Sequence, residues 1–353
     1  MHFRRTFAPE NYIINTMIKH AFVTGATGLL GGQIVRALVA RNIEVSALVR
    51  SREKAAKMFG NLKINFVEGD ILQPESYRAG LKGCDALFHT AAFFRDALKG
   101  GKHWQTLYDT NVVGTKNLLQ VAYEEGVRRV VHTSSIGVLE GKRGQIIDET
   151  MLRSSNTSND YYRSKILSDE AVLSFLDTHP DMFACFVLPG WMFAPADMGP
   201  TSSGQFILDF LQKKLPGVMK ASFSPVDARD VAEHQILAME KGRRGERYLA
   251  AGRHMEMREI MATLAQVSGV PMPTRKIPNA LLWTIAYLNE FYHFLTKKPI
   301  LLSRASVKGI EDEYDCTRFS HEKSARELGA SFRPFAETLK DTIAWYRENN
   351  WIK

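Results

Sequence analysis

The sequence predicts an α/β fold: a doubly wound parallel sheet in the first half, followed by a smaller, mainly helical lobe. The prediction rests on the length of 353 residues, on strand-like apolar runs that alternate with helical patterns, and on a change of pattern after Pro189. A chain of this length exceeds the usual size of one domain. Strands that alternate with helices form parallel sheets with right-handed crossover connections.

The elements follow one another in a regular order through the first half. Six apolar runs predict buried strands, at 20–25, 44–49, 64–69, 85–92, 128–135 and 183–190. Segments between them repeat apolar residues at helical spacing, at 28–42, 74–83, 110–126 and 161–178. Prolines then break the chain into shorter pieces, at 195, 200, 216 and 225.

We therefore expect three parts. Residues 1–16 lack the apolar core of a secretory signal. Met17 directly precedes the first strand, so we expect 1–16 to form an extension outside the fold. Residues 17–190 form the large α/β domain, and 226–240 return to it. Residues 191–353 form the second lobe, which we expect to bind the substrate.

Composition and charge narrow the class of protein. The hydrophobic content of 45% and charged content of 24% are ordinary for a globular chain. The formal charge is +8, but the basic residues are scattered and no nucleic-acid-binding motif occurs, so we expect no nucleic-acid partner. Three distant cysteines without a CxxC pair suit a reducing, cytoplasmic location. The histidines lack metal-ligand spacing, so no metal site is expected.

The longest apolar stretch lies at 278–302. Asn289, Glu290, His293 and Lys297 interrupt it, so it falls short of the ~20 apolar residues that a membrane span needs. Two interpretations stay open. The segment is either an amphipathic helix packed on the second lobe or a peripheral contact with a membrane surface.

A glycine-rich turn after the first strand predicts a Rossmann-type dinucleotide site. Glycines in a GxxGxxG pattern allow a tight turn, let main-chain N–H groups approach a pyrophosphate, and place the helix N-terminus at the same anion. The alternative is a turn that only packs the helix on the strand. Its place as the first strand-to-helix turn favours the cofactor. The residues expected to contact it are Gly25, Thr27, Gly28, Leu29, Leu30 and Gly31.

Basic residues after the second strand favour NADP(H). An enzyme that uses NAD(H) usually places Asp or Glu there, to bind the ribose 2′-hydroxyl. This chain has Arg50, Arg52, Lys54 and Lys57, whose charges suit a 2′-phosphate, although they would also suit the solvated start of a helix. Glu53 in the same segment leaves NAD(H) open.

A tyrosine and a lysine predict acid–base chemistry. Tyr161 and Lys165 lie one helical turn apart on one face. An ammonium beside a phenol favours the phenolate, so we expect a tyrosine pKa below its ordinary ~10. Such a tyrosine exchanges a proton with a carbonyl oxygen during hydride transfer. Ser135 ends a predicted strand, where its hydroxyl either holds the substrate oxygen or caps the loop.

The glycine turn, Ser135, Tyr161 and Lys165 together resemble the extended branch of the short-chain dehydrogenase/reductase superfamily, which includes NAD-dependent epimerases and dehydratases. The resemblance covers essentially 18–353. Asn111 begins a long predicted helix, from which it could bridge to the active site through water; the resemblance implies instead that it fixes the backbone. The resemblance also implies that Ser135, Tyr161 and Lys165 are catalytic and that Tyr161 and Lys165 also contact the cofactor. Further implied cofactor contacts are Asp70, Ile71, Thr90, Ala91, Ala92, Thr133, Pro189, Gly190 and Met192.

Within this branch, the segments 48–50, 161–172 and 315–349 look like dihydroflavonol-reductase and 3β-hydroxysteroid-dehydrogenase relatives. Leu188 departs from the arginine usual before the nicotinamide segment. Sugar-nucleotide enzymes of the branch often carry an aromatic residue that 137–141 lacks. The residues expected to contact the substrate are Phe93, Phe94, Ser135, Trp191 and Phe193.

We therefore expect an NADP(H)-dependent oxidoreductase that reduces a ketone or aldehyde of a fairly apolar small molecule, or oxidises the alcohol. Two alternatives stay open: a nucleotide-sugar epimerase or dehydratase with tightly held cofactor, and an NADP(H)-sensing protein without turnover. We expect a monomer or a homodimer.

Overall fold

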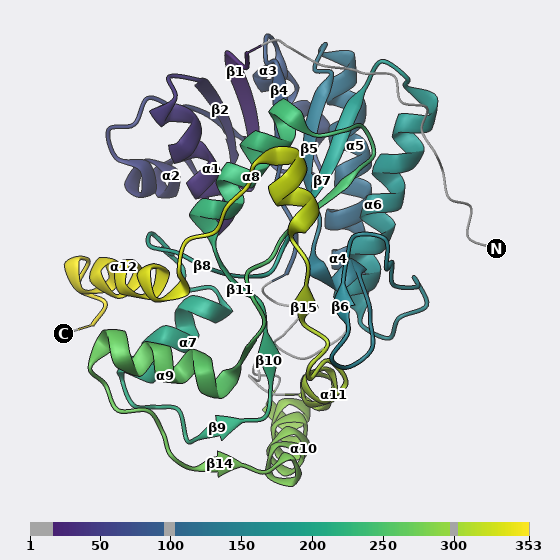
Figure 1. The fold of residues 1–353 in the computed structure, drawn as a ribbon. Helices are drawn as coiled ribbons and strands as arrows, with labels where there is room; N and C mark the ends of the chain where they lie inside the picture. The colour runs from purple at the N-terminus through teal and green to yellow at the C-terminus, as the bar shows by residue number, and fades with distance from the viewer. Residues whose placement is uncertain (1–16, 95–102, 297–302, 353) are drawn as a thin grey trace.

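The computed structural model describes residues 17–94, 103–296 and 303–352, so the extension expected at 1–16 lies outside the described residues. Its centre is a seven-stranded parallel sheet of order β12-β7-β5-β4-β1-β2-β3 (Figure 1). In chain order the strands are β1 (His20–Thr24), β2 (Glu44–Val49), β3 (Asn65–Glu68), β4 (Ala86–His89), β5 (Arg129–Thr133), β7 (Phe183–Pro189) and β12 (Arg247–Ala250). The predicted doubly wound α/β fold is confirmed.

Helices cover both faces of the sheet. Side chains alternate between the faces, so Ala21 and Val23 of β1 join one core while Phe22 joins the other. The first face carries α1 (Leu29–Ala40), α2 (Arg52–Phe59) and α8 (Ala228–Lys241). The second carries α3 (Arg78–Leu81), α5 (Gly114–Glu124) and α6 (Asp160–Thr178). Cover on both faces explains why the strands are nearly continuous apolar runs.

The second lobe packs around its own core. Phe193, Leu339 and Tyr346 are buried there between three helices. These are α7 (Ser202–Leu211), α9 (Met257–Ser268) and α12 (Phe335–Glu348). A separate helix pair, α10 (Asn279–Thr296) and α11 (Arg304–Asp312), lies at the bottom of the molecule in Figure 1.

Four short strand pairs lie outside the large sheet. They are β8 (Trp191–Phe193) with β11 (Pro225–Asp227), β9 (Val218–Met219) with β14 (Lys276–Ile277), β10 (Ser222–Phe223) with β13 (Met255–Glu256), and β6 (Ile146–Ile147) with β15 (Arg318–Phe319). The β8–β11 pair continues directly from β7, so it carries the chain from the sheet into the second lobe.

Several element boundaries differ from the prediction. The helix expected at 110–126 is preceded by α4 (Trp104–Tyr108) and begins with a π-helical turn at Asp109–Val113. The helix expected at 74–83 is a 3-10 turn (Pro74–Ser76) followed by the single turn of α3. The seventh strand, β12, was missed, because four residues are too few for a local pattern to show sheet pairing.

The chain returns to the large sheet twice after 190. Helix α8 packs on the same face as α1, within the segment expected to return. Strand β12 then pairs with β7, from Arg247 opposite Phe186 to Ala250 opposite Pro189. The division into lobes at residue 190 stays a prediction. In the described residues, each helix is too short or too polar to cross a bilayer.

Candidate active site

The topology places a ligand site at the carboxyl ends of β1, β4 and β5. From β1 the chain builds β2 and β3 on one side, and then β4, β5 and β7 on the other. Ligands of doubly wound sheets bind outside the carboxyl ends of the strands, where the order reverses. The reversal lies between β1 and β4, and the segments after these strands carry the predicted site residues.

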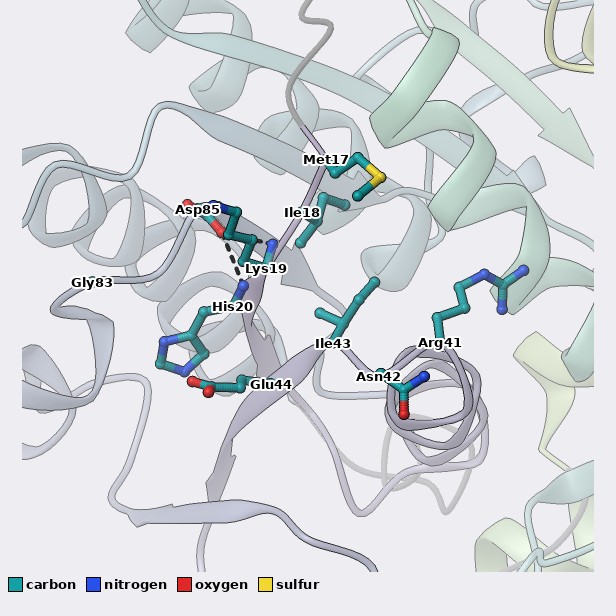
Figure 2. A pocket seen from close by; sticks show the side chains of 10 residues that line it. All are labelled: Met17, Ile18, Lys19, His20, Arg41, Asn42, Ile43, Glu44, Gly83 and Asp85. Carbon is teal, nitrogen blue, oxygen red and sulfur yellow. Dashed lines mark hydrogen bonds between the residues drawn. The ribbon is translucent and has the colours of Figure 1, made fainter.

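A different hollow, of about 500 Å³, lies at the amino ends of the strands, opposite this site (Figure 2). Its lining includes the start of β1 and β2. The main-chain N–H groups of Lys19 and His20 donate to a carboxylate oxygen of Asp85, at 2.7 and 2.9 Å. These polar groups satisfy one another across the strand starts, so we assign the hollow a structural role.

The glycine turn is held tightly against the loop after β4. Gly25 has φ +65°, and a Cβ there would lie 2.7 Å from the Thr90 hydroxyl oxygen. A Cβ on Gly31 would overlap the carbonyl oxygen of Gly25. Thr27 and Gly28 are exposed at the start of α1, whereas Leu29 and Leu30 are buried. The turn therefore presents main chain at a helix N-terminus, which fits a dinucleotide pyrophosphate.

The loop after β4 forms the other side of this turn. The Thr90 hydroxyl donates to the carbonyl oxygen of Thr24 at 2.7 Å, and the N–H of Ala91 donates to the Thr24 hydroxyl at 3.2 Å. Asn111 then binds the main chain of Phe93 from both sides, with the N–H of Phe93 donating at 2.7 Å. The expectation that Asn111 fixes the backbone is confirmed. Ala92 is exposed beside these groups.

The predicted adenosine end lies after β2 and β3. Arg50 and Lys54 are exposed there, and the Ser51 hydroxyl caps α2 by accepting from the N–H of Lys54 at 3.3 Å. Lys57 forms an exposed ion pair with Glu53 at 2.8 Å.

Asp70 is held within its own turn, since its carboxylate accepts from the N–H of Leu72 at 2.9 Å. Ile71 is buried, with its side chain against Gly114. The side chain of Ile71 is therefore turned into the core, and a ligand beside it would meet its main chain.

Ser135 and Tyr161 meet at the carboxyl end of β5. Asn159 caps α6 by accepting from the N–H of Tyr162 at 3.1 Å, which fixes the first turn that carries Tyr161. The Ser135 hydroxyl lies near enough to Tyr161 to lower the pKa of its phenol. Ser135 also accepts from the N–H of Gly137 at 3.1 Å, so it fulfils the capping alternative as well. The ring of Phe94 lies edge-on to Tyr161, with centroids 4.7 Å apart.

Lys165 lies one turn further along α6. Its ammonium donates to the carbonyl oxygen of Thr133 at 2.6 Å, and Gln235 donates to the Thr133 hydroxyl at 2.8 Å. The structure thus brings four of the predicted residues together at the carboxyl end of β5: Thr133, Ser135, Tyr161 and Lys165.

The expected lowering of the Tyr161 pKa is wrong for this structure. Burial raises the pKa of Tyr161 to about 12, the hydrogen bond from Ser135 opposes the rise, and the charge of Asp169 adds to it. Burial lowers the pKa of Lys165 to about 8, and Asp169 opposes this change. The physical reason is that desolvation outweighs the attraction we expected, while the ammonium is bound to the Thr133 carbonyl.

Asp169 was missed by the sequence interpretation. Its buried carboxylate accepts from the Ser134 hydroxyl at 2.8 Å and lies 3.5 Å from both His132 and Arg247. The local signal was available, because Asp169 follows Lys165 by four residues on the same helical face. The proximity of Arg247 to Asp169 could not be predicted, because Arg247 belongs to β12, which is distant in the sequence.

The residues expected at the nicotinamide and substrate lie in β7, β8 and the loop between them. Pro189 ends β7, and the N–H of Gly190 donates to the carbonyl oxygen of Ala250 at 3.2 Å. Trp191 and Met192 are half-buried. Phe193 is only 1% exposed and packs on Phe335, so it supports Trp191 from behind rather than facing a ligand.

No group of three or more histidine, cysteine, aspartate or glutamate side chains among the described residues could hold a metal ion. A doubly wound sheet with a glycine turn and this Ser–Tyr–Lys group defines the class of nicotinamide-dependent short-chain dehydrogenases/reductases.

The chain belongs to the NAD dependent epimerase/dehydratase family, whose profile matches residues 21–251. It is 35% identical over 333 residues to sterol demethylase protein B of Methylococcus capsulatus, covering 94% of this chain and 99% of that protein. It is 30% identical over 340 residues to a putative dihydroflavonol 4-reductase of Synechocystis, covering 94% and 96%. The solved structure of gox2253 superposes with a TM-score of 0.79 at 29% identity, covering 95% of this chain and 100% of that one.

These likenesses confirm the extended branch of the superfamily. The chain is an NAD(P)-dependent enzyme, and its cofactor is a nicotinamide dinucleotide. The preference between NAD(H) and NADP(H), the substrate and the catalytic residues are argued below.

Proposed function

We propose that the enzyme uses NADP(H) to reduce a ketone or aldehyde of a fairly apolar small molecule, or to oxidise the corresponding alcohol. The observation that carries this proposal is the placement of the Ser135 hydroxyl near Tyr161, beside the ring of Phe94. Two neighbouring hydroxyls can bind one carbonyl oxygen together. An apolar ring next to them suits a substrate with few polar groups.

Each side chain has a distinct role in this proposal. The cofactor supplies or accepts the hydride when it is bound. The Ser135 hydroxyl holds the substrate oxygen, and the Tyr161 hydroxyl donates its proton to that oxygen as charge develops there. Because its pKa is about 12, Tyr161 is protonated at neutral pH, which is the form that reduction requires. When Lys165 is protonated, it provides a positive charge one helical turn from Tyr161.

Apolar side chains support the choice of substrate. Phe93, Phe94 and Trp191 lie on the segments that border Tyr161 and the nicotinamide side. A nucleotide sugar would need basic groups for its diphosphate, and Lys220 instead lies over the ring of Tyr314, 4.4 Å from its centroid. The names of the sterol and dihydroflavonol relatives point to ring-containing substrates for those proteins. The nucleotide-sugar and sensor alternatives lack a comparable observation.

The substrate class is tested with a panel of carbonyl compounds in the presence of NADPH. We expect turnover and thermal stabilisation with aromatic, steroid-like or long-chain ketones, because their apolar surfaces can pack on the aromatic side chains beside Tyr161. UDP- and dTDP-sugars serve as the comparison. Conversion of the sugar nucleotides alone would establish the epimerase alternative, and cofactor binding without turnover of any compound would establish the sensor.

Arg50→Ala is expected to weaken NADPH binding by about 1.5–3 kcal/mol, because a charge-assisted hydrogen bond to the 2′-phosphate is lost. NADH binding should change little. Titration of both cofactors against wild type and variant measures the effect. Arg52→Ala is the matched control, since Arg52 is equally basic and exposed but lies beside Glu68. Equal affinity of the wild type for both cofactors would contradict the proposed preference.

We further propose a cytoplasmic enzyme that is a monomer or a homodimer and binds no nucleic acid. Cys84 and Cys185 are buried as free thiols, and Cys316 is half-buried and also free. Unpaired cysteines of this kind suit a reducing compartment.

A further inference from the structure

Helix α10 has two different apolar faces. One face packs inward, where Leu282 and Ala286 join Ile277 and Val307 in a small core. The other carries large side chains that are 38–64% exposed, and at 3.6 residues per turn they share one sector of about 140°. Monomeric proteins rarely expose a continuous apolar patch of this kind without a binding role. We call it the α10 patch: Leu281, Tyr287, Leu288, Phe291, Tyr292 and Leu295.

The start of helix α10 is positively charged. Arg275 and Lys276 are exposed just before the helix, and Lys297 and Lys298 come after it in the sequence. The helix itself contains one acidic residue, Glu290, which is paired with Arg304 at 2.6 Å. Glu311 of the neighbouring α11 accepts from the indole N–H of Trp283 at 3.2 Å. The exposed charge at the described start of the patch is therefore basic.

We propose that the α10 patch docks the protein on a membrane surface that contains anionic lipids, with the helix lying in the plane of the interface. Leucine and phenylalanine enter the acyl boundary, and tyrosine places its ring there with its hydroxyl in the headgroups. Clusters of lysine and arginine add attraction to anionic lipid. The packed face fits the first interpretation of the 278–302 segment, as far as its described residues extend. The proposal assigns the second interpretation to the exposed face.

A second copy of the chain fits the patch less well than lipid does. In a two-fold dimer the same patch meets itself. Such a dimer would cover the apolar side chains but would give Arg275 and Lys276 no anionic partner. An anionic surface provides one.

A series of contacts joins the helix that carries the α10 patch to the proposed active site. α10 packs on α11, and residue Glu313 follows α11 directly. Its carboxylate accepts from the Tyr162 hydroxyl at 2.9 Å, beside Tyr161 on the same helix. Docking would therefore place the membrane on the side of the molecule that holds α11 (Figure 1). If the proposed apolar substrate is correct, it reaches the site from the bilayer; the docking itself does not depend on it.

The test is sedimentation of the full chain with vesicles of phosphatidylcholine, alone or mixed with phosphatidylglycerol. We expect the wild type to pellet with the mixed vesicles and less with phosphatidylcholine alone. Leu288→Glu/Phe291→Glu should lower the partition coefficient at least about tenfold, since two charges enter the apolar contact. Arg275→Glu/Lys276→Glu should remove most of the dependence on phosphatidylglycerol. Ile146→Glu, at an equally exposed isoleucine outside the patch, should bind as the wild type does.

The outcomes separate the alternatives. A wild type that stays in the supernatant with mixed vesicles overturns the proposal. A second result would also overturn it: the wild type is a dimer, and Leu288→Glu/Phe291→Glu makes it a monomer without changing vesicle binding. In that case a second copy of the chain covers the patch. Reduction of a water-soluble ketone without vesicles is measured in parallel. If the wild type does not reduce such a ketone, the proposed function is contradicted, whereas the docking result is unaffected.

Discussion

Tyr161→Phe is expected to lower turnover by about 10²–10⁴-fold while leaving cofactor affinity nearly unchanged. The variant keeps the ring and its contact with Phe94 but removes the hydroxyl near Ser135. The proton donor to the substrate oxygen is therefore lost without a change of shape. Steady-state reduction of a ketone found in the panel, together with NADPH titration, measures both quantities.

Two further variants make this result specific. Tyr162→Phe removes a hydroxyl from the next residue, which binds Glu313 rather than Ser135, and should retain turnover within about tenfold. Lys165→Ala should lower both turnover and cofactor affinity, because the resemblance places this ammonium beside the nicotinamide ribose. Melting curves check that each variant is folded. A Tyr161→Phe enzyme that keeps most of its activity would exclude the proposed mechanism.

Gly31→Ala is expected to lower the affinity for the cofactor by about 10–100-fold and to destabilise the fold by about 1–3 kcal/mol. The new Cβ would overlap the carbonyl oxygen of Gly25 and lie 2.9 Å from the Thr90 hydroxyl. The turn, or the loop after β4, must then move away from the position that presents main chain to the pyrophosphate. Cofactor titration and urea denaturation measure the two effects.

Gly309→Ala is the matched control for this substitution. Gly309 is also a helical glycine, but no atom lies within 4 Å of an added Cβ. Alanine there should leave cofactor affinity unchanged and hold or raise stability, because alanine favours the helix. If Gly31→Ala binds the cofactor as tightly as the wild type, the glycine turn does not hold the pyrophosphate.

Much of the large domain was predictable from local patterns. Strands that are buried on both faces need unbroken apolar runs, so β7 was visible as residues 183–190. The range expected for the helix that carries Tyr161 and Lys165 was 161–178, and α6 extends from Asp160 to Thr178. The place of the glycine turn followed from its neighbours, since a turn between the first strand and the first helix has only one position in this fold.

Other features depend on residues distant in the sequence and were not predictable. β12 is a strand because β7 offers it an open edge, and its local sequence does not show that. Arg247 reaches Asp169 only because β12 joins the sheet there. Phe193 looked like part of a substrate wall, but the helices of the second lobe bury it.

The sequence by itself determined the α/β class, the order of the main strands, and the spacing that puts Tyr161 and Lys165 on one helical face. These are local properties, because hydrophobic periodicity and turn chemistry act over a few residues. The tertiary structure alone decided how much water each group loses. That loss raised the pKa of Tyr161 instead of lowering it, and it left one face of α10 exposed while burying the other. Desolvation depends on everything packed around a side chain, so no local pattern can supply it.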